Sequence, residues 1–131
     1  MSGRGAMIAR WAAALLLAGS ALSEVWGIPG EWAYSRTAMQ RAVVLGELGM
    51  IVAGLAGGVG VMLRRRWAVP TAAAWGACVV LAGGLAPRAF GGTPWSVSAV
   101  TALVCVLVGL ATVLLTWAGV RAPVRPAAVP R

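Results

Sequence analysis

Residues 45–67 read LGELGMIVAGLAGGVGVMLRRRW, an apolar run with six glycines, one glutamate near its start and three arginines at its end. As a helix, the apolar part is long enough to cross about 30 Å of hydrocarbon. Arginines directly after such a run are typical of a helix that ends at the cytoplasmic membrane surface. The stretch therefore predicts a membrane-spanning helix, and it makes a membrane protein the first hypothesis for the whole chain.

The rest of the chain has the same character. Of its 131 residues 60% are hydrophobic and only 11% are charged, which is outside the usual range of soluble domains. Apolar stretches near or above the length of a membrane helix occupy residues 7–23, 42–63, 68–86 and 96–120, and the longest connection is an outer loop, 24–41. We predict an all-α fold: a single integral membrane domain, 1–131, forming a four-helix bundle with short loops.

The eleven basic residues, all arginines, predict an orientation. Positive charge is retained on the cytoplasmic side, and eight arginines fall on one side of the four spans. These are Arg4, Arg10, Arg64, Arg65, Arg66, Arg121, Arg125 and Arg131. Both termini are therefore expected to be cytoplasmic, in a bacterial cytoplasmic (inner) membrane. The same pattern accounts for the net charge of +8 without nucleic acid as a partner.

The first 24 residues allow a second interpretation. They also have the basic start, short apolar run and small residues of a secretory signal, with Ala21 and Ser23 placed for a cut before Glu24. Removing this segment would leave three spans in the same orientation. The arginine count therefore does not distinguish a retained helix from a cleaved signal.

Helical periodicity sorts the small residues of the second span into two stripes. One stripe holds Gln40, Glu47, Gly54 and Gly58, and the other holds Gly46, Gly49, Ala53, Gly57 and Gly60. Small residues let membrane helices approach closely, so this helix should have two neighbours. We favour neighbours within the same chain; a membrane-protein partner or a second copy is the alternative.

The fourth span carries a seam of small and polar residues at helical spacing: Ser98, Thr101, Cys105, Gly109, Thr112 and Thr116. We interpret it as a packing seam that bonds to other helices, rather than a hydrophilic conduit, because it holds no ionisable group. Cys78 and Cys105 lie at similar depths and could meet near the midplane. Without a CxxC spacing, the alternative is that each is an inert apolar residue.

Glu47 is the main candidate for a functional residue, with Gln40 as a second intramembrane polar group. Counted from Arg41, Glu47 lies roughly 9 Å inside the outer interface, where a charge is costly unless it is paired or protonated. Arg36, Arg41 and Arg88 are the possible ion-pair partners on that side. The structural alternative is a buried glutamate that only fixes helix register. The outer loop should turn at Gly27, Pro29 and Gly30.

Missing residue types narrow the chemistry. The chain has no histidine, aspartate or lysine, which excludes histidine-ligated haem or zinc, a Ser-His-Asp triad and a Schiff-base lysine within this chain. With only three glutamates, a carboxylate metal cage and paired-carboxylate catalysis are not expected either. We therefore predict no cofactor, no metal site and no catalytic residue, and expect that the protein is not an enzyme on its own.

A resemblance adds to this interpretation. The sequence GELG at 46–49, followed by GLAGGVGVMLRRRWAV at 54–69, resembles the second helix of DoxX-type small bacterial membrane proteins over about 30 residues, together with their four-helix plan. The resemblance implies that Glu47 matches that family's second-helix acid, and that a role in quinone, thiosulfate or thiol redox chemistry is expected. Of the glycine and lysine often found near the end of the first span in that family, only Gly19 is present.

Three functions follow as hypotheses. The first is a non-catalytic accessory or structural subunit of a membrane complex, because both stripes of the second span need neighbours. The second is a DoxX-like redox partner that works with a quinone or another subunit. The third is small-solute or proton-coupled transport through Glu47.

Overall fold

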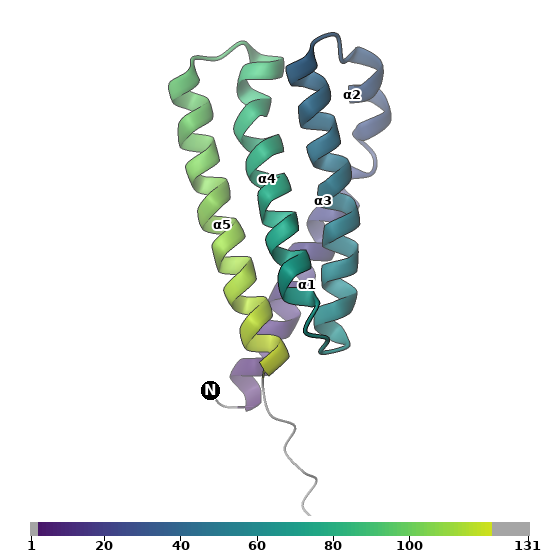
Figure 1. Ribbon diagram of the computed structural model, residues 1–131, viewed down its shortest axis with the longest axis vertical. Helices are drawn as coiled ribbons and strands as arrows, with labels where there is room; N and C mark the ends of the chain where they lie inside the picture. Colours follow the sequence, from purple (N-terminus) through teal and green to yellow (C-terminus); the bar gives the residue numbers. More distant parts are fainter. Residues whose placement is uncertain (1–2, 122–131) are drawn as a thin grey trace, which may run out of the picture.

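The structure, a computed structural model, describes residues 3–121, and all of its regular elements in that range are helices (Figure 1). They are α1 (Gly3–Glu24), α2 (Ile28–Tyr34), α3 (Ala38–Met62), α4 (Ala68–Gly91) and α5 (Trp95–Arg121). Four of these, α1, α3, α4 and α5, are long and apolar enough to cross a membrane. The prediction of an all-α chain with four membrane-length helices is confirmed. The predicted spans were 7–23, 42–63, 68–86 and 96–120. Each helix starts at or before its predicted span and ends after it, except that α3 ends one residue earlier than predicted.

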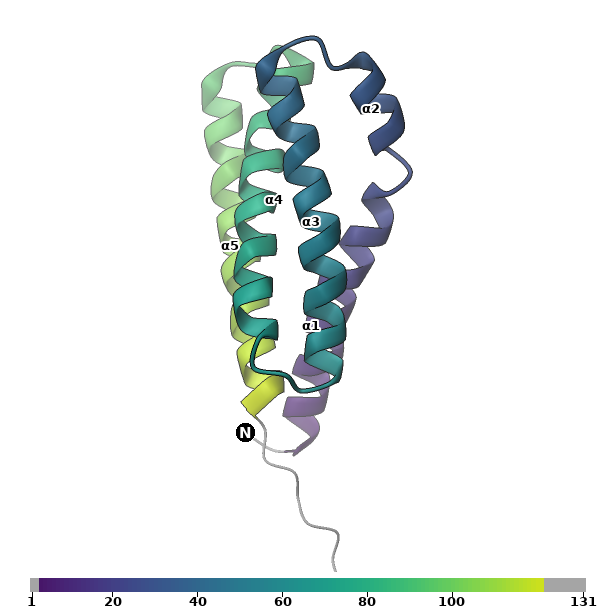
Figure 2. The ribbon, with the colours of Figure 1, turned by 45° about the vertical axis from the view of Figure 1, so that its right-hand side comes forward.

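The four long helices run alternately up and down, and neighbours in sequence pack together. α3 contacts α1 and α4, α4 contacts α5, and α1 closes the ring against α5. α1 runs obliquely behind the other helices (Figure 1). At the end of the bundle that carries α2, α1 and α2 lie on one side of α3 while α4 and α5 lie on the other (Figure 2).

The segment 24–41 is not a loop, which corrects the sequence prediction. Residues 25–27 form a tight turn, and α2 follows with Pro29 in its first turn. Proline fits that position because the first helical N–H groups have no partner inside the helix. α2 then folds back against α3, which starts at a capping box formed by Thr37 and Gln40. The predicted turn at Gly27, Pro29 and Gly30 is therefore a turn followed by a helix.

The glycines of α3 lie where a neighbouring helix leaves no room for a side chain. A Cβ on Gly54 would come within 2.5 Å of the Leu17 carbonyl oxygen of α1, and one on Gly58 within 3.3 Å of the Ala18 side chain. On the other stripe, Gly46 faces Ala82 of α4 at 3.2 Å. Gly57 likewise lies against Leu17 and Thr71. Gly49 lies against Cys78, and Gly60 lies against the Trp67 ring. One stripe thus packs on α1 and the other mainly on α4.

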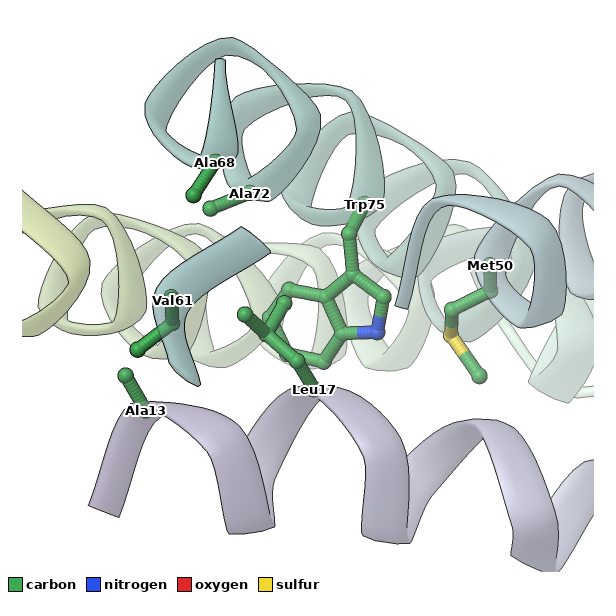
Figure 3. Close-up of a cluster of buried hydrophobic side chains, with 7 residues drawn as sticks. All are labelled: Ala13, Leu17, Met50, Val61, Ala68, Ala72 and Trp75. Carbon is green, nitrogen blue, oxygen red and sulfur yellow. The ribbon is translucent and has the colours of Figure 1, made fainter. Parts of the chain in front are cut away.

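Trp75 fills the middle of the bundle. It is 2% exposed, and it belongs to a core cluster with Ala13, Leu17, Met50, Val61, Ala68 and Ala72 (Figure 3). Its Nε1 donates a hydrogen bond to the Ser20 hydroxyl at 3.0 Å, and that hydroxyl donates to the Leu17 carbonyl at 3.1 Å. Trp75 therefore connects α4 to α1 through a polar contact inside an apolar core.

α4 and α5 approach most closely where glycine meets glycine. A Cβ on Gly76 would lie 3.3 Å from the Gly109 Cα, and the reverse distance is the same. We predicted that the hydroxyls of the α5 seam bond to other helices. Among the described residues they do not. Instead Thr112 donates to the Val108 carbonyl at 2.8 Å and Thr101 to the carbonyl of Val97 at 2.9 Å, both within α5. The seam packs through its small size rather than through cross-helix hydrogen bonds.

Candidate functional site: a cluster of three carboxyl groups

Glu47 lies on α3 near the α2 end of the bundle, in the same stripe as Gly54 but two turns further toward that end. Its side chain is half-buried, and its Oε2 atom is buried with no hydrogen-bond partner among the described residues. The Glu31 carboxyl group of α2 lies next to the Glu47 carboxyl group, and Glu24, the last residue of α1, acts on both through its charge. Glu31 and Glu47 are thus neighbours, and Glu24 lies close enough to act on them through its charge; we call these three groups, the only side-chain carboxyls of the sequence, the acidic cluster.

The local structure around α2 brings the three groups together. The Gly27 N–H donates to the Glu24 carbonyl at 3.0 Å, which closes the turn after α1. Glu31 Oε1 lies 3.6 Å from where a Gly27 Cβ would be, so the Glu31 side chain folds over that turn. The Ser35 hydroxyl donates to the Glu31 carbonyl at 2.7 Å and supports the end of α2. The contact of α2 with α3 then places Glu31 beside Glu47.

No arginine neutralises Glu47 within residues 3–121. The Arg88 guanidinium donates to the Thr93 and Gly92 carbonyls, at 3.1 and 3.5 Å, and lies over the Trp95 ring at 5.5 Å. Arg36 and Arg41 are exposed. The ion pair expected from Arg36, Arg41 or Arg88 is replaced by a contact between like groups.

Gln40 has a structural task at the start of α3. Its Oε1 accepts hydrogen bonds from the N–H groups of Arg36 and Thr37, at 2.8 and 3.1 Å, and its Nε2 donates to the Ala89 carbonyl of α4 at 3.0 Å. The side chain thus caps α3 and ties it to the end of α4. Its polar groups are already used by the backbone, and it is not part of the acidic cluster.

The chemistry of the acidic cluster follows from its buried oxygens. The Oε2 atoms of Glu31 and Glu47 are both buried acceptors without a donor in the described part of the chain. Two neighbouring carboxyl groups ionise together only at high cost, and one proton shared between them would supply the missing donor. Among residues 3–121, no three acidic or cysteine side chains are arranged to hold a metal ion.

Both cysteines are free, and they point into different helix interfaces. The Cys78 sulfur lies over Gly49 of α3, where a Cβ would approach it to 2.7 Å, while the Cys105 sulfur lies over Gly83 of α4 at the same distance. The meeting of Cys78 and Cys105 that the depth argument allowed is not formed. Each sulfur fills the space that a glycine leaves on the neighbouring helix.

Comparison with known proteins adds no relative. No protein family, no curated protein and no solved structure matches this chain. The resemblance to DoxX-type proteins remains an expectation based on residues 46–49 and 54–69.

The sequence pointed to Glu47 but not to Glu24 or Glu31. Both fall in the predicted outer loop, 24–41, where a glutamate is normally solvated. One feature of the sequence could have drawn attention to them. The chain has only three acidic residues beside eleven arginines, so each glutamate could have been treated as a candidate functional residue. The fold of α2 was needed to show that they lie together.

Proposed function

We propose that this is a multi-pass protein of a bacterial cytoplasmic membrane, with both termini in the cytoplasm, and that its function is proton-linked. The acidic cluster holds a proton between Glu31 and Glu47 at the outer end of the bundle, and a cation from the outer aqueous phase exchanges with that proton. The observation that carries the proposal is that Glu31 and Glu47 are neighbours with buried Oε2 atoms that no donor of the described residues reaches, while Glu24 adds its charge nearby.

The energetics support a neutralised cluster. A single charged side chain in the membrane core costs about 2.5–3.5 kcal/mol on insertion scales, and a second like charge beside it adds repulsion. An arginine would have been the simplest counter-charge, since the chain has eleven. A proton, or a cation that replaces it, leaves the buried oxygens of Glu31 and Glu47 satisfied. An ionisable residue inside a membrane helix is by default a candidate for a functional site.

The arginine distribution supports the orientation. Arg64 and Arg66 lie at the α3–α4 turn and Arg121 at the end of α5, whereas α2 is at the opposite end of the bundle (Figure 1). By the positive-inside rule, the arginine-rich end is cytoplasmic. The acidic cluster would then face the outer side, where external cations arrive.

Proton release on cation binding tests the proposal. Purified protein in weakly buffered detergent solution, with a pH-indicator dye, is titrated with Na⁺, K⁺ or tetramethylammonium chloride. We expect release approaching one proton per chain with at least one cation, and its loss in Glu47→Gln and in Glu31→Gln. Arg36→Gln, an exposed residue near α2, is the control and should behave as wild type. No release with any cation, or unchanged release in Glu47→Gln, would overturn the exchange.

The accessory-subunit role is a second candidate, and the close packing of α3 changes what could support it. Gly54 and Gly58 lie against α1, so the stripes that suggested a partner are filled within the chain. Support would have to come from copurification in mild detergent. A stoichiometric membrane partner that stays bound to Glu47→Gln would favour a subunit role over the proton-linked one. A redox role of the DoxX type would instead require quinone-linked turnover that depends on Glu47 or the cysteines.

A further inference from the structure

A cavity of about 550 Å³ lies at the end of the bundle opposite the acidic cluster. Arg64 and Arg66 of the α3–α4 turn, Val69 of α4, and Trp117, Val120 and Arg121 of α5 line it; we call it the arginine pocket. The lining combines guanidinium groups with an aromatic ring and two valines. Its volume is in the range of small-molecule sites, about 300–1,000 Å³.

The positive charge around the arginine pocket has no acidic side chain to balance it. Arg121 lies over the Trp117 ring, with its Cζ 4.4 Å from the centroid. Arg10 of α1 is close enough to Arg64 for the two charges to repel, and its Nε is buried with no partner in the described part of the chain. The three glutamates of the sequence are all in the acidic cluster, at the far end. No side-chain carboxylate of the sequence is therefore near enough to pair with these arginines.

Arg64, which lines the arginine pocket, has a backbone conformation that is unusual for a residue other than glycine. The Arg65 N–H donates to the Gly60 carbonyl at 2.8 Å and the Arg64 N–H to the Val61 carbonyl at 3.1 Å, the two bonds of a Schellman motif. Arg64 occupies the left-handed position of that motif, with φ of 55°, where glycine is strongly favoured. An arginine held at a glycine position carries a conformational cost, which points to a role for its side chain.

We propose that the arginine pocket binds the phosphate headgroup of an anionic phospholipid. Guanidinium groups match phosphate oxygens through paired N–H donors, and Arg64, Arg66 and Arg121 supply them from two elements. Trp117, Val69 and Val120 provide apolar contact for the glycerol and acyl part, and indole rings favour the headgroup depth of a bilayer. Free phosphate shares the headgroup's charge but not this apolar part, so the valines and the tryptophan favour the lipid.

Native mass spectrometry of the delipidated full-length protein in detergent tests the proposal, with phosphatidylglycerol as the probe. Basic residues near a membrane surface each contribute about fivefold to anionic-lipid affinity. R64Q/R121Q should therefore bind phosphatidylglycerol roughly 25-fold more weakly than wild type. R36Q/R41Q removes the same charge at the other end of the bundle and should bind normally. Phosphatidylcholine should bind weakly to all of them.

R64G separates a lipid-binding role from a structural one. Glycine relieves the left-handed position, so this variant should melt at or above the wild-type temperature while binding phosphatidylglycerol about fivefold more weakly. Unchanged affinity in both R64G and R64Q/R121Q would overturn the proposal. Inorganic phosphate is the last arm: if it displaced the lipid at equal concentration, the pocket would be a soluble-phosphate site and the lipid proposal would be wrong.

Discussion

The three glutamates are the residues on which the proposed function rests. Glu47 comes from α3, Glu31 from α2 and Glu24 from the end of α1, so the acidic cluster exists only when all three elements are in place. The arginines that could neutralise it are exposed or bonded to backbone carbonyls instead. Protonation of the cluster should therefore be linked to folding.

The first prediction concerns stability as a function of pH. Glu31 and Glu47 lie together with buried oxygens in the folded chain and separate when it unfolds, so repulsion between two ionised carboxylates destabilises the folded state as pH rises and is absent at low pH. The thermal midpoint of the purified protein should fall between about pH 5 and about pH 9. Glu31→Gln should flatten this dependence and be more stable at the upper end, by on the order of 1 kcal/mol. A midpoint that rises with pH, or the same slope in Glu31→Gln, would contradict it.

The second prediction concerns the hydrogen bond from Trp75 to Ser20. It connects α4 to α1 at 3.0 Å inside the core. Hydrogen bonds between membrane helices contribute about 0.6–2 kcal/mol, so Ser20→Ala should lower the free energy of unfolding by that amount. Trp75→Phe should cost more because it also removes ring volume. In a double-mutant cycle the two losses should not add; strict additivity would mean that the bond contributes nothing.

At the scale of elements, α3 is the central helix because both of its small stripes are covered. Gly54 meets the Leu17 carbonyl of α1, and Gly46 meets Ala82 of α4. This explains why a membrane helix that gains nothing from the hydrophobic effect carries six glycines: close contact is what holds it to its neighbours.

The third prediction tests that contact. A Cβ on Gly54 would clash with a backbone oxygen that cannot move aside, so Gly54→Ala should destabilise the bundle by about 1–3 kcal/mol. Gly19→Ala is the matched control: nothing lies within 4 Å of the added methyl group, and alanine favours the helix by up to about 1 kcal/mol. Denaturant unfolding in mixed micelles measures both. If Gly54→Ala were as stable as Gly19→Ala, the α1–α3 interface would not be as close as described.

The fourth prediction concerns the cysteines. Cys78 lies over α3 and Cys105 over α4, so no disulfide should form within a chain that stays folded under mild oxidant. Alkylation after denaturation, followed by intact mass, should find two free thiols per chain. Recovery of an intramolecular disulfide would show that α4 and α5 take another rotation.

Much of this architecture was predictable, and the parts that were not have physical reasons. Four long apolar runs specify membrane helices because a bilayer leaves the backbone few alternatives. α2 was missed because seven residues with a Pro-Gly pair look like a turn, and its helix depends on packing against α3. The partner of Glu47 was missed for the same reason: the charge count offered three arginines on that side, but only the fold of α2 brings Glu31 close.

At the scale of the whole molecule, the carboxyl groups are confined to the α2 end, which also carries Arg36, Arg41 and Arg88, whereas the charged side chains described at the other end are all arginines. One end gathers the three carboxyl groups, and the other gathers Arg10, Arg64, Arg66 and Arg121. We propose that each arrangement binds a group of opposite charge, a proton or cation at one end and an anionic headgroup at the other. The proposed roles of the two ends are independent, and each has its own test.

The fifth prediction concerns topology and the start of the chain. α1 supplies Leu17 and Ala13 to the core and contacts both α3 and α5. We therefore expect it to be retained, with an intact mass that includes residues 1–23, and reporter fusions to place both termini in the cytoplasm. A mature chain that begins at Glu24 would mean that the bundle forms from three long helices and that the α1 contacts described here are not used.

Infrared difference spectroscopy of the reconstituted protein during a pH titration tests the central claim most directly, because it detects the C=O stretch of protonated carboxyl groups. The shared proton predicts one protonated carboxyl group per chain at neutral pH, with a band that shifts or disappears in Glu47→Gln and in Glu31→Gln. If no protonated carboxyl group were detected at neutral pH, or if the band were the same in both variants, Glu31 and Glu47 would not hold a proton between them and the proton-linked function would be wrong.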